Sequence, residues 1–236
     1  MHMIAWVFDI DGVLCDTGQT MPVDFAQWFI TWAQNKNIFY VTGSHKEKTI
    51  DVLGQEVYDL ALVKYHCLGN YIVTNKEEYY FNQFELKEHE NNFLESLIQS
   101  SPYPIKTGRH INQRPGSINF SIVGRNADQK QRLDYKSYDK LTNERLQIIE
   151  KIKIHMPQYE AYLGGDISID ICNSGANKGQ CVEYVRTIDG VGDIIFFADR
   201  IGPYGIDKPF CDAMAPTDKF YHVNGFKDTW NILKTI

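Results

Sequence analysis

Residues 6–16, W-V-F-D-I-D-G-V-L-C-D, decide the fold of this chain. The apolar run at residues 4–8 predicts a short buried strand, and it ends on two carboxylates, Asp9 and Asp11, followed at once by Gly12. In an open parallel sheet, functional groups gather outside the carboxyl ends of the strands, and glycine lets the backbone turn sharply there. We therefore expect Asp9 and Asp11 at the mouth of an α/β fold.

The two carboxylates also predict a ligand. Asp9 and Asp11 are so close in the chain that they repel each other unless a cation or a shared proton neutralises them. Mg²⁺ prefers oxygen ligands and keeps coordination places for phosphate oxygens. An acidic turn that simply follows a strand is the alternative interpretation, and the two residues alone leave both open.

Composition bounds the class of protein. The 236 residues are enough for one large domain or for a core with an insertion, and the 43% hydrophobic content supports a packed core. The net charge of −6 disfavours a general nucleic-acid binder, because phosphate backbones require a basic surface. It remains compatible with a small anion in a locally basic pocket.

The cysteines and the first residues bear on localisation. Five cysteines, an odd number without a C-x-x-C pair, favour reduced thiols in an intracellular protein. The start of the chain lacks the basic flank and long apolar centre of a signal peptide, and no run approaches the ~18 apolar residues of a membrane-spanning helix. We expect a cytoplasmic protein with no membrane or nucleic-acid partner.

The first third of the chain has the pattern of a parallel α/β fold. Apolar residues at spacings of three and four predict a helix over residues 23–35. Residues 38–41 predict a strand that ends in Thr42-Gly43-Ser44, and residues 45–53 predict a helix that stops at Gly54. Residues 60–71 and 72–74 look like further short strands.

The middle of the chain has a different pattern. A charged stretch at residues 85–99 and another at residues 139–155 predict helices. Residues 117–123 alternate apolar and polar side chains, as a half-exposed antiparallel strand does, and residues 167–171 alternate again. Two such strands and two helices predict an α+β insertion.

After Gly175 the pattern of the first third returns. It comprises a helix, a strand that ends in Ala198-Asp199, a further strand and a terminal helix, at residues 178–186, 194–197, 220–223 and 227–236. We therefore expect a discontinuous core domain at residues 1–80 and 175–236, interrupted by an α+β cap domain at residues 81–174.

Four polar features each follow a strand or open a helix. They are Asp9 with Asp11, Thr42 with Ser44, Lys178, and Asp199 with Asp207. Each feature also has an ordinary structural explanation: a hydroxyl can cap the next helix, and a lysine or a loop carboxylate can simply be solvated. The ordered combination indicates chemistry more strongly than any one member does.

That combination resembles the haloacid dehalogenase (HAD) superfamily of phosphatases and phosphotransferases. Its first motif, D-x-D-G-[T/V], stands at residues 9–13, and its second, a strand-ending Ser or Thr, is Thr42. Its third, a lysine, is Lys178. Its fourth, an acidic strand end, is F-F-A-D with Asp199, followed by Asp207. The resemblance implies a Rossmann-type parallel core with an inserted cap.

The resemblance also implies roles for these residues. Asp9 would be the nucleophile that becomes an aspartyl-phosphate, and Asp11 the general acid/base. A carboxylate can take a phosphoryl group covalently and so split one difficult transfer into two easier ones. The resemblance implies that Mg²⁺ is bound by Asp9, the backbone carbonyl of Asp11, Asp199 and Asp207. The phosphoryl oxygens would be bound by Thr42, Gly43 and Lys178.

The inserted segment is similar to the cap of the eukaryotic-type phosphomannomutases, a type IIB cap. Residues 114–125, R-P-G-S-I-N-F-S-I-V-G-R, resemble their R-N-G-M-L-N-x-S-P-x-G-R, and residues 164–171, G-G-D-I-S-I-D-I, resemble their G-G-Q-I-S-F-D-V. Residues 199–207, D-R-I-G-P-Y-G-I-D, are similar to their D-K-T-x-P-G-G-N-D loop. The likeness runs in order over essentially the whole chain.

The cap resemblance implies how a substrate is held. Arg114, Arg125 and Arg132 would bind a phosphate at the far end of a hexose, and Ser168 and Asp170 would contact phosphate or hydroxyl groups. Arginine's planar fork suits phosphate oxygens. Solvated surface arginines are the alternative. The related mutases are commonly dimers that associate through the cap, so the resemblance allows a homodimer here.

The chain departs from the family pattern at several positions. The basic residue that the family carries shortly after its first motif has no counterpart in residues 16–19, and Val13 replaces the usual threonine. In the cap strand, Pro115 and Ser117 replace Asn and Met. Thr42 stands where many mutases have glycine, and it is the more usual residue of a phosphatase.

Three functions follow from these features. The first is a Mg²⁺-dependent phosphotransferase on a hexose phosphate that interconverts 1- and 6-phosphates, because three cap arginines suit a second phosphate. The second is a sugar-phosphate phosphatase on the same scaffold. The third is a catalytically silent sugar-phosphate binding protein, which the joint presence of Asp9, Asp11, Lys178 and Asp199 disfavours.

Overall fold

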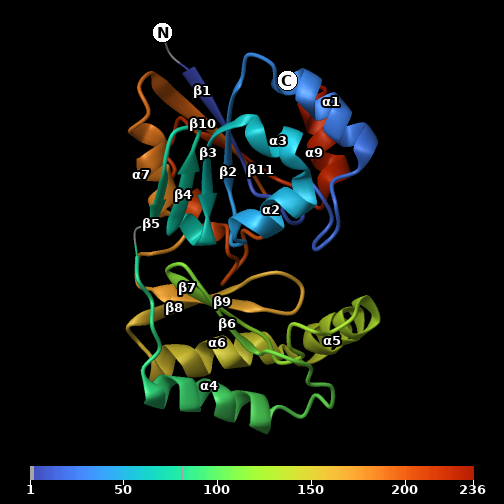
Figure 1. The fold of residues 1–236 in the computed structure, drawn as a ribbon, viewed down its shortest axis with the longest axis vertical. Helices are drawn as coiled ribbons and strands as arrows, with labels where there is room; N and C mark the ends of the chain where they lie inside the picture. The colour runs from blue at the N-terminus through green and yellow to red at the C-terminus, as the bar shows by residue number, and fades with distance from the viewer. Residues whose placement is uncertain (1–2, 81) are drawn as a thin grey trace.

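The chain builds two separate sheets. The computed structural model describes residues 3–80 and 82–236, and within them one sheet has seven strands in the order β11-β10-β1-β2-β3-β4-β5 and the other has four in the order β6-β7-β9-β8. Figure 1 shows the larger sheet with its helices above the smaller one. We call the larger sheet with its helices the core, and the smaller sheet with α4, α5 and α6 the cap.

The core sheet is parallel except at one edge. Its parallel strands are β1 (Met3–Phe8), β2 (Asn37–Val41), β3 (Ala61–His66), β10 (Val191–Ala198) and β11 (Lys219–His222), and its antiparallel edge is β4 (Tyr71–Thr74) and β5 (Glu78–Tyr80). Strand β1 lies between β10 and β2, so the order reverses at β1. In such sheets ligands bind in the crevice outside the strand ends at the reversal. The predicted α/β class is confirmed.

Helices cover both faces of the core sheet. Trp6 and Phe8 join an apolar cluster with one set of helices, whereas Ala5 and Val7 join a second cluster on the opposite face. The first set is α1 (Val23–Ala33), α2 (Lys46–Leu53), α3 (Gln55–Asp59) and α9 (Phe226–Leu233), and the second is α7 (Gln180–Arg186) with α8 (Lys208–Ala213). Burial on both faces explains the unbroken apolar run before Asp9. Burying a side chain such as Phe8 contributes about 2 kcal/mol to the free energy of unfolding.

The cap sheet is antiparallel and covered by helices on one face. Its strands are β6 (Ile111–Arg114), β7 (Ser117–Phe120), β8 (Tyr159–Leu163) and β9 (Ile169–Asn173), and its helices are α4 (Glu88–Ser100), α5 (Gln129–Thr142) and α6 (Glu144–His155). Ile118, Phe120, Ile169 and Ile171 pack in the cluster on the helix side. The alternate, polar residues of β7 and β9 therefore face the core, and Figure 1 shows α4 and α6 on the far side of the sheet.

Two expectations about the cap are wrong. We expected a half-exposed strand at residues 117–123, but the strand ends at Phe120 and all four of its residues are buried, because the core covers its polar face. We expected one helix at residues 139–155. Asn143 adopts a left-handed conformation (φ 55°) and separates α5 from α6, as asparagine does at helix ends.

Most of α5 lies before the helix expected at residues 139–155. It begins at a capping box in which Asp128 accepts from Gln131 N (2.8 Å) and Gln131 accepts from Asp128 N (2.9 Å). The elements with no counterpart among the predictions are β5, β6, β8, α3 and α8, each of five residues or fewer except α8 with six. Such short segments carry little periodicity.

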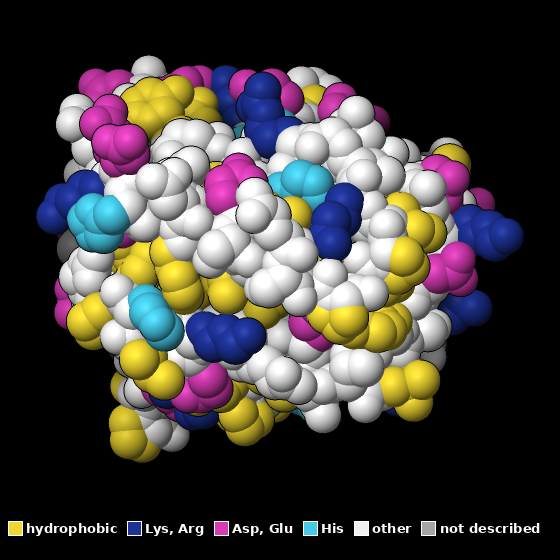
Figure 2. Space-filling view, turned by 90° about the horizontal axis from the view of Figure 1, so that it is seen from below, with side chains coloured by type: hydrophobic (Ala, Val, Ile, Leu, Met, Phe, Trp, Pro, Cys, Tyr) yellow, Lys and Arg dark blue, Asp and Glu magenta, His cyan; other side chains and the backbone are white. Residues whose placement is uncertain are grey.

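No helix in the described part of the chain is long and apolar enough to cross a membrane. Figure 2 shows the molecule from below, the end formed by the cap, where lysine and arginine side chains are scattered among acidic and hydrophobic ones.

Candidate active site

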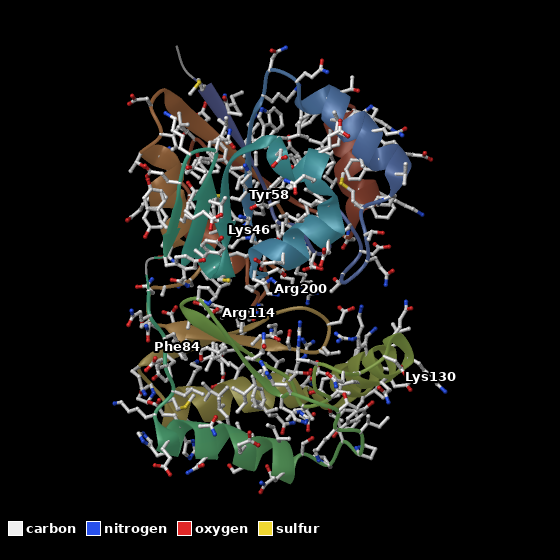
Figure 3. All side chains as sticks on the ribbon, viewed as in Figure 1. Lys46, Tyr58, Phe84, Arg114, Lys130 and Arg200 are labelled. Atoms are coloured by element: carbon white, nitrogen blue, oxygen red, sulfur yellow. The ribbon has the colours of Figure 1, made fainter. Side chains whose placement is uncertain are left out.

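A cavity of about 520 Å³ lies between the core and the cap. Its core wall includes Asp9, Asp11, Thr42 and Lys178, and its cap wall includes Arg114, Arg125, Arg132, Ser168 and Asp170. Figure 3 shows Arg114 and Arg200 at the junction of the two parts. The strand ends of the core sheet and the polar face of the cap sheet thus enclose one site.

Lys178 organises the deepest part of the core wall. It lies just before α7, fully buried, and its Nζ donates to Asp9 Oδ1 (2.7 Å) and Asp207 Oδ1 (2.6 Å). Burial alone would lower the pKa of Lys178, but the charges of Asp207 and Asp9 raise it above its usual value. A buried charge requires this kind of pairing, so Lys178 remains a cation beside the Asp9 carboxylate.

Three carboxylates form an acidic cluster at this point. Oxygens of Asp9, Asp199 and Asp207 lie within 4.8 Å of one another. Burial, reinforced by the charge of Asp207, raises the pKa of Asp9 to about 7 and that of Asp199 to about 8. Asp199 Oδ1 is buried and accepts no hydrogen bond from any residue that the structure describes. An all-oxygen donor set with a free buried oxygen fits a hard cation such as Mg²⁺.

Gly12 lets the first motif approach this cluster. Its φ is +90°, and a Cβ there would lie 2.2 Å from Asp199 Oδ2. Both the conformation and the close contact require glycine. The predicted sharp turn after Asp11 is thereby confirmed, and it serves to bring the end of β1 against the end of β10.

Asp11 has different surroundings from Asp9. Its Oδ2 accepts from Lys48 Nζ (2.7 Å) and from Ser44 Oγ (3.4 Å), and its Oδ1 accepts from Gly18 N (2.9 Å). Burial pushes the pKa of Asp11 upward, but Lys48 and these hydrogen bonds outweigh it, so the pKa lies below its usual value. The pKa of Asp9 is therefore raised and the pKa of Asp11 is lowered. Such a difference between two neighbouring carboxylates allows them to take different acid/base roles.

The turn after β2 closes the core wall. Thr42 is buried and its Oγ1 accepts from Ser44 N (3.0 Å), while Gly43 O accepts from Arg114 Nη1 (2.7 Å). The alternative explanation, that Thr42 or Ser44 only caps the following helix, is wrong. The N-cap of α2 is His45, whose Nδ1 accepts from Lys48 N (3.3 Å).

The cap wall carries a buried network around Asp170. Asp170 Oδ1 accepts from Arg114 Nη1 (3.2 Å) and from Asn119 Nδ2 (2.8 Å), and Arg125 Nη1 donates to Asn119 Oδ1 (3.0 Å). Burial, together with the like charges of Arg114 and Arg132, lowers the pKa of Arg125. The buried Arg114 Nε lacks a hydrogen-bond partner within residues 3–80 and 82–236. Neighbouring arginine charges and a free N–H donor on Arg114 form a suitable binding site for an anion.

Arg132 and Arg145 donate hydrogen bonds to backbone carbonyls of this wall. Arg132 donates to Ala127 O through Nε and to Arg125 O through Nη2, both at 2.9 Å. Arg145 Nη1 donates to Ser168 O (3.1 Å) and thereby holds the buried Ser168 at the cavity. Both arginines thus order the backbone beside the site.

The structure brings the predicted residues together. Ten line the cavity, namely Asp9, Asp11, Thr42, Gly43, Arg114, Arg125, Arg132, Ser168, Asp170 and Lys178. Asp199 and Asp207 join Asp9 in the acidic cluster behind that wall.

Sequence reasoning missed three residues at the site. Lys48, Asn119 and Arg200 all line the cavity. Lys48 lies in the first turn of α2 and donates to the Oγ of Ser44 (3.0 Å), which lies just before the N-cap His45. Arg200 Nη2 donates to Thr17 Oγ1 (3.5 Å). These two cations lie beside the segment after the first motif, where the expected basic residue is absent.

The chain is similar in sequence to phosphomannomutases of plants and yeast. The family model of the eukaryotic phosphomannomutases matches residues 26–236. A phosphomannomutase of Triticum aestivum is 30% identical over 216 residues, which cover 88% of this chain and 85% of that protein. A phosphomannomutase of Saccharomyces cerevisiae is 28% identical over 202 residues, which cover 82% and 79%.

Solved structures show the same fold at low identity. The C-terminal domain of C. albicans trehalose-6-phosphate phosphatase superposes with a TM-score of 0.70 at 12% identity, covering 99% of this chain and 91% of that one. A haloacid dehalogenase-like hydrolase of Bacteroides thetaiotaomicron gives 0.62 at 11% identity, covering 100% and 99%. This confirms the HAD fold with an inserted cap. The match over residues 26–236 shows that the chain belongs to the eukaryotic phosphomannomutase family, and it is an enzyme of the phosphotransferase and phosphatase type.

Proposed function

We propose that this protein is a Mg²⁺-dependent phosphotransferase that interconverts the 1- and 6-phosphates of a hexose through a phosphorylated Asp9. One observation carries the proposal: the cavity has a carboxylate–lysine pair on one wall and a cluster of arginines on the other. A mutase has to hold one phosphate while the other reacts, whereas hydrolysis of a monophosphate needs one phosphate site. The names of the relatives support a sugar phosphate as substrate.

Asp9 and Asp11 divide the chemistry between them. Lys178 holds Asp9 Oδ1, so Oδ2 is the oxygen that attacks phosphorus. As the new O–P bond forms, the bond from phosphorus to the sugar oxygen breaks and Asp11 gives that oxygen a proton. In the reverse half-reaction Asp11 takes the proton of a sugar hydroxyl, whose oxygen attacks the phosphorus on Asp9. The lowered pKa of Asp11 suits a cycle that begins with Asp11 as the base.

The acidic cluster supports Mg²⁺ as the cofactor. Asp9 and Asp199, with the backbone carbonyl of Asp11, are the proposed ligands, because Asp199 Oδ1 is buried without a donor in the described chain. Asp207 Oδ1 accepts from Lys178, and its Oδ2 accepts from Arg200 N (3.1 Å), so we assign Asp207 chiefly to holding Lys178. Bound Mg²⁺ would neutralise charge on the transferred phosphoryl group.

The phosphoryl oxygens and the distal phosphate have separate binding groups. Thr42, Gly43 and Lys178 lie on the Asp9 side of the cavity and would hold the reacting phosphoryl group. On the cap wall, Arg114 and Arg125 would hold the other phosphate, and Arg132 keeps the Arg125 backbone in place. Ser168 and Asp170, which line the same wall, would contact hydroxyls or phosphate.

Three further expectations stay predictions. They are the domain limits at residues 1–80, 175–236 and 81–174, a homodimer formed through the cap, and a cytoplasmic location.

A sugar-phosphate phosphatase is the second candidate function. Thr42 is the residue usual in phosphatases, and residues 16–19 carry no basic side chain. The two functions differ in whether a sugar hydroxyl or water attacks the phosphorus on Asp9. Cap closure, which excludes water, decides between them.

Phosphorus NMR separates the two functions directly. Purified protein is incubated with Mg²⁺, mannose 1-phosphate and a trace of hexose 1,6-bisphosphate. We expect a 6-phosphate signal to grow without free phosphate. Free phosphate in its place would assign the enzyme as a phosphatase, and the absence of any change would contradict both functions for this sugar.

A further inference from the structure

The loop between Asp199 and Asp207 belongs to the core, yet it is bonded to the cap. Leu163 N donates to Tyr204 O (2.7 Å), and Gly205 forms a parallel β-bridge with Leu163. Leu163 ends β8, which is the outer strand of the cap sheet. The loop that carries two residues of the acidic cluster therefore extends the sheet of the other domain.

Tyr204 makes the most extensive of these contacts. Its ring packs against the apolar cluster of the cap, and Lys153 Nζ on α6 lies 5.0 Å from the ring centroid. Its hydroxyl accepts from Lys153 Nζ (3.0 Å) and donates to Glu150 on the same helix.

The backbone of Tyr204 is strained. Its φ is +60°, a left-handed conformation that bulky residues rarely adopt. A residue in this conformation persists where surrounding contacts over-determine it, and such positions cluster at sites where the strain serves function. The contacts to β8 and α6 provide that surrounding.

Two further residues of this loop contact the cap and lie next to the acidic cluster. Arg200 at its start bonds Asp166 of the cap (3.3 Å) and lies 3.4 Å from Asp199. Ile206 near its end joins an apolar cluster with Cys172 of the cap. Movement of the cap away from the core would break these contacts in the same step as those of Tyr204.

We propose that Tyr204 is a positioning residue that holds the cap closed over the Asp199–Asp207 loop and thereby sets the ratio of phosphoryl transfer to hydrolysis. This inference rests on the proposed mutase function. In hydrolysis a water oxygen attacks phosphorus on Asp9, the bond between phosphorus and the Asp9 oxygen breaks, and Asp11 takes the proton of the water. Closure keeps water from that phosphorus, so each contact that stabilises closure favours the sugar hydroxyl as acceptor.

The test replaces Tyr204 without adding strain. Tyr204→Asn removes the ring while asparagine tolerates the left-handed backbone, and Tyr204→Phe keeps the ring but loses the hydroxyl. Tyr80→Asn is the control, because Tyr80 is a core tyrosine that is 64% exposed on the edge strand β5. Free phosphate and hexose 6-phosphate are measured in one reaction by phosphorus NMR, with mannose 1-phosphate and a trace of hexose 1,6-bisphosphate.

We expect Tyr204→Asn to raise the ratio of free phosphate to 6-phosphate about fivefold by populating the open cap. The Phe variant should show a smaller rise, since the hydroxyl contacts on α6 are exposed, and Tyr80→Asn should match the wild type. An unchanged ratio in Tyr204→Asn would overturn the proposal.

A second measurement tests the role of Tyr204 independently of the proposed mutase function. Spin labels at Val23→Cys in the core and Leu141→Cys in the cap, positions 68% and 84% exposed, report the distance between the domains. Tyr204→Asn should broaden the distance distribution, and an unbroadened distribution would contradict the role of Tyr204. If the wild type forms no 6-phosphate, the mutase function fails, while the distance measurement still tests Tyr204.

Discussion

The two walls of the cavity carry net charges of opposite sign. On the core wall the charges are paired: Lys178 lies between Asp9 and Asp207, and the cluster retains surplus negative charge. On the cap wall Arg114 and Arg125 share the single Asp170 network and retain surplus positive charge. The core wall therefore suits a cation and a transferring phosphoryl group, and the cap wall suits a second, unreactive phosphate.

The largest expected effect comes from the nucleophile on the core wall. Asp9→Asn removes the carboxylate that takes the phosphoryl group, and we expect turnover to fall by about 10³-fold or more. Lys178 keeps Asp207 as a partner in this variant, and thermal unfolding followed in parallel checks that the protein remains folded. A folded Asp9→Asn protein with full turnover would disprove the assignment of the core wall.

The next effect tests the cap wall. Arg125→Ala removes a charged donor, a loss of about 1.5–3 kcal/mol for a phosphate bound there. Affinity for hexose 1,6-bisphosphate, measured by calorimetry, should therefore fall about 10- to 100-fold, and affinity for inorganic phosphate far less. Arg109→Ala, which removes an exposed arginine nearby, serves as the control. Equal losses for both ligands would mean that the cap does not bind the second phosphate.

Mg²⁺ should stabilise the protein more at pH 8 than at pH 5.5. Because the folded protein holds the pKa of Asp9 at about 7 and that of Asp199 at about 8, it binds more protons than the unfolded chain above pH ~4. Without metal, these two groups make stability fall as pH rises through that range, since their ionised forms repel. Mg²⁺ relieves this repulsion and contributes ~2–3 kcal/mol at about 100 times its Kd.

The check is the shift of Tm with Mg²⁺ at the two pH values. Asp199→Asn, which loses one proposed ligand, should abolish most of the shift. A Mg²⁺ shift that is equal at both pH values would show that the acidic cluster does not bind the ion.

The smallest effect concerns the difference between Asp9 and Asp11 within the core wall. Lys48→Met removes the cation that lowers the pKa of Asp11, so that pKa rises and Asp11 acts as a base only at higher pH. The acid limb of the kcat/KM profile should move to higher pH, with activity recovered above it. Lys46→Met, which removes a lysine that pairs with Glu78, is the control. An unmoved acid limb would exclude Asp11 as the base.

Local patterns in the chain were enough to predict the core. The apolar run before Asp9, the strand before Thr42 and the strand before Asp199 each end on a polar residue, and parallel strands bring such ends to one edge. The cap was harder, because β7 is polar on the face that the core covers. Its burial follows from contact between domains, which alternation along a strand does not report.

Motif order predicted which residues come together at the cavity: Asp9, Asp11, Thr42 and Lys178 each follow a strand or open a helix, and all four line it. Tertiary contacts alone decided what distinguishes them. Lys48 lies 37 residues from Asp11 and lowers its pKa, and Leu163 N donates to the Tyr204 carbonyl across the domain boundary. Strand and helix periodicity is a local property of the chain, whereas charge, burial and pKa depend on groups that only folding brings within a few ångströms of one another.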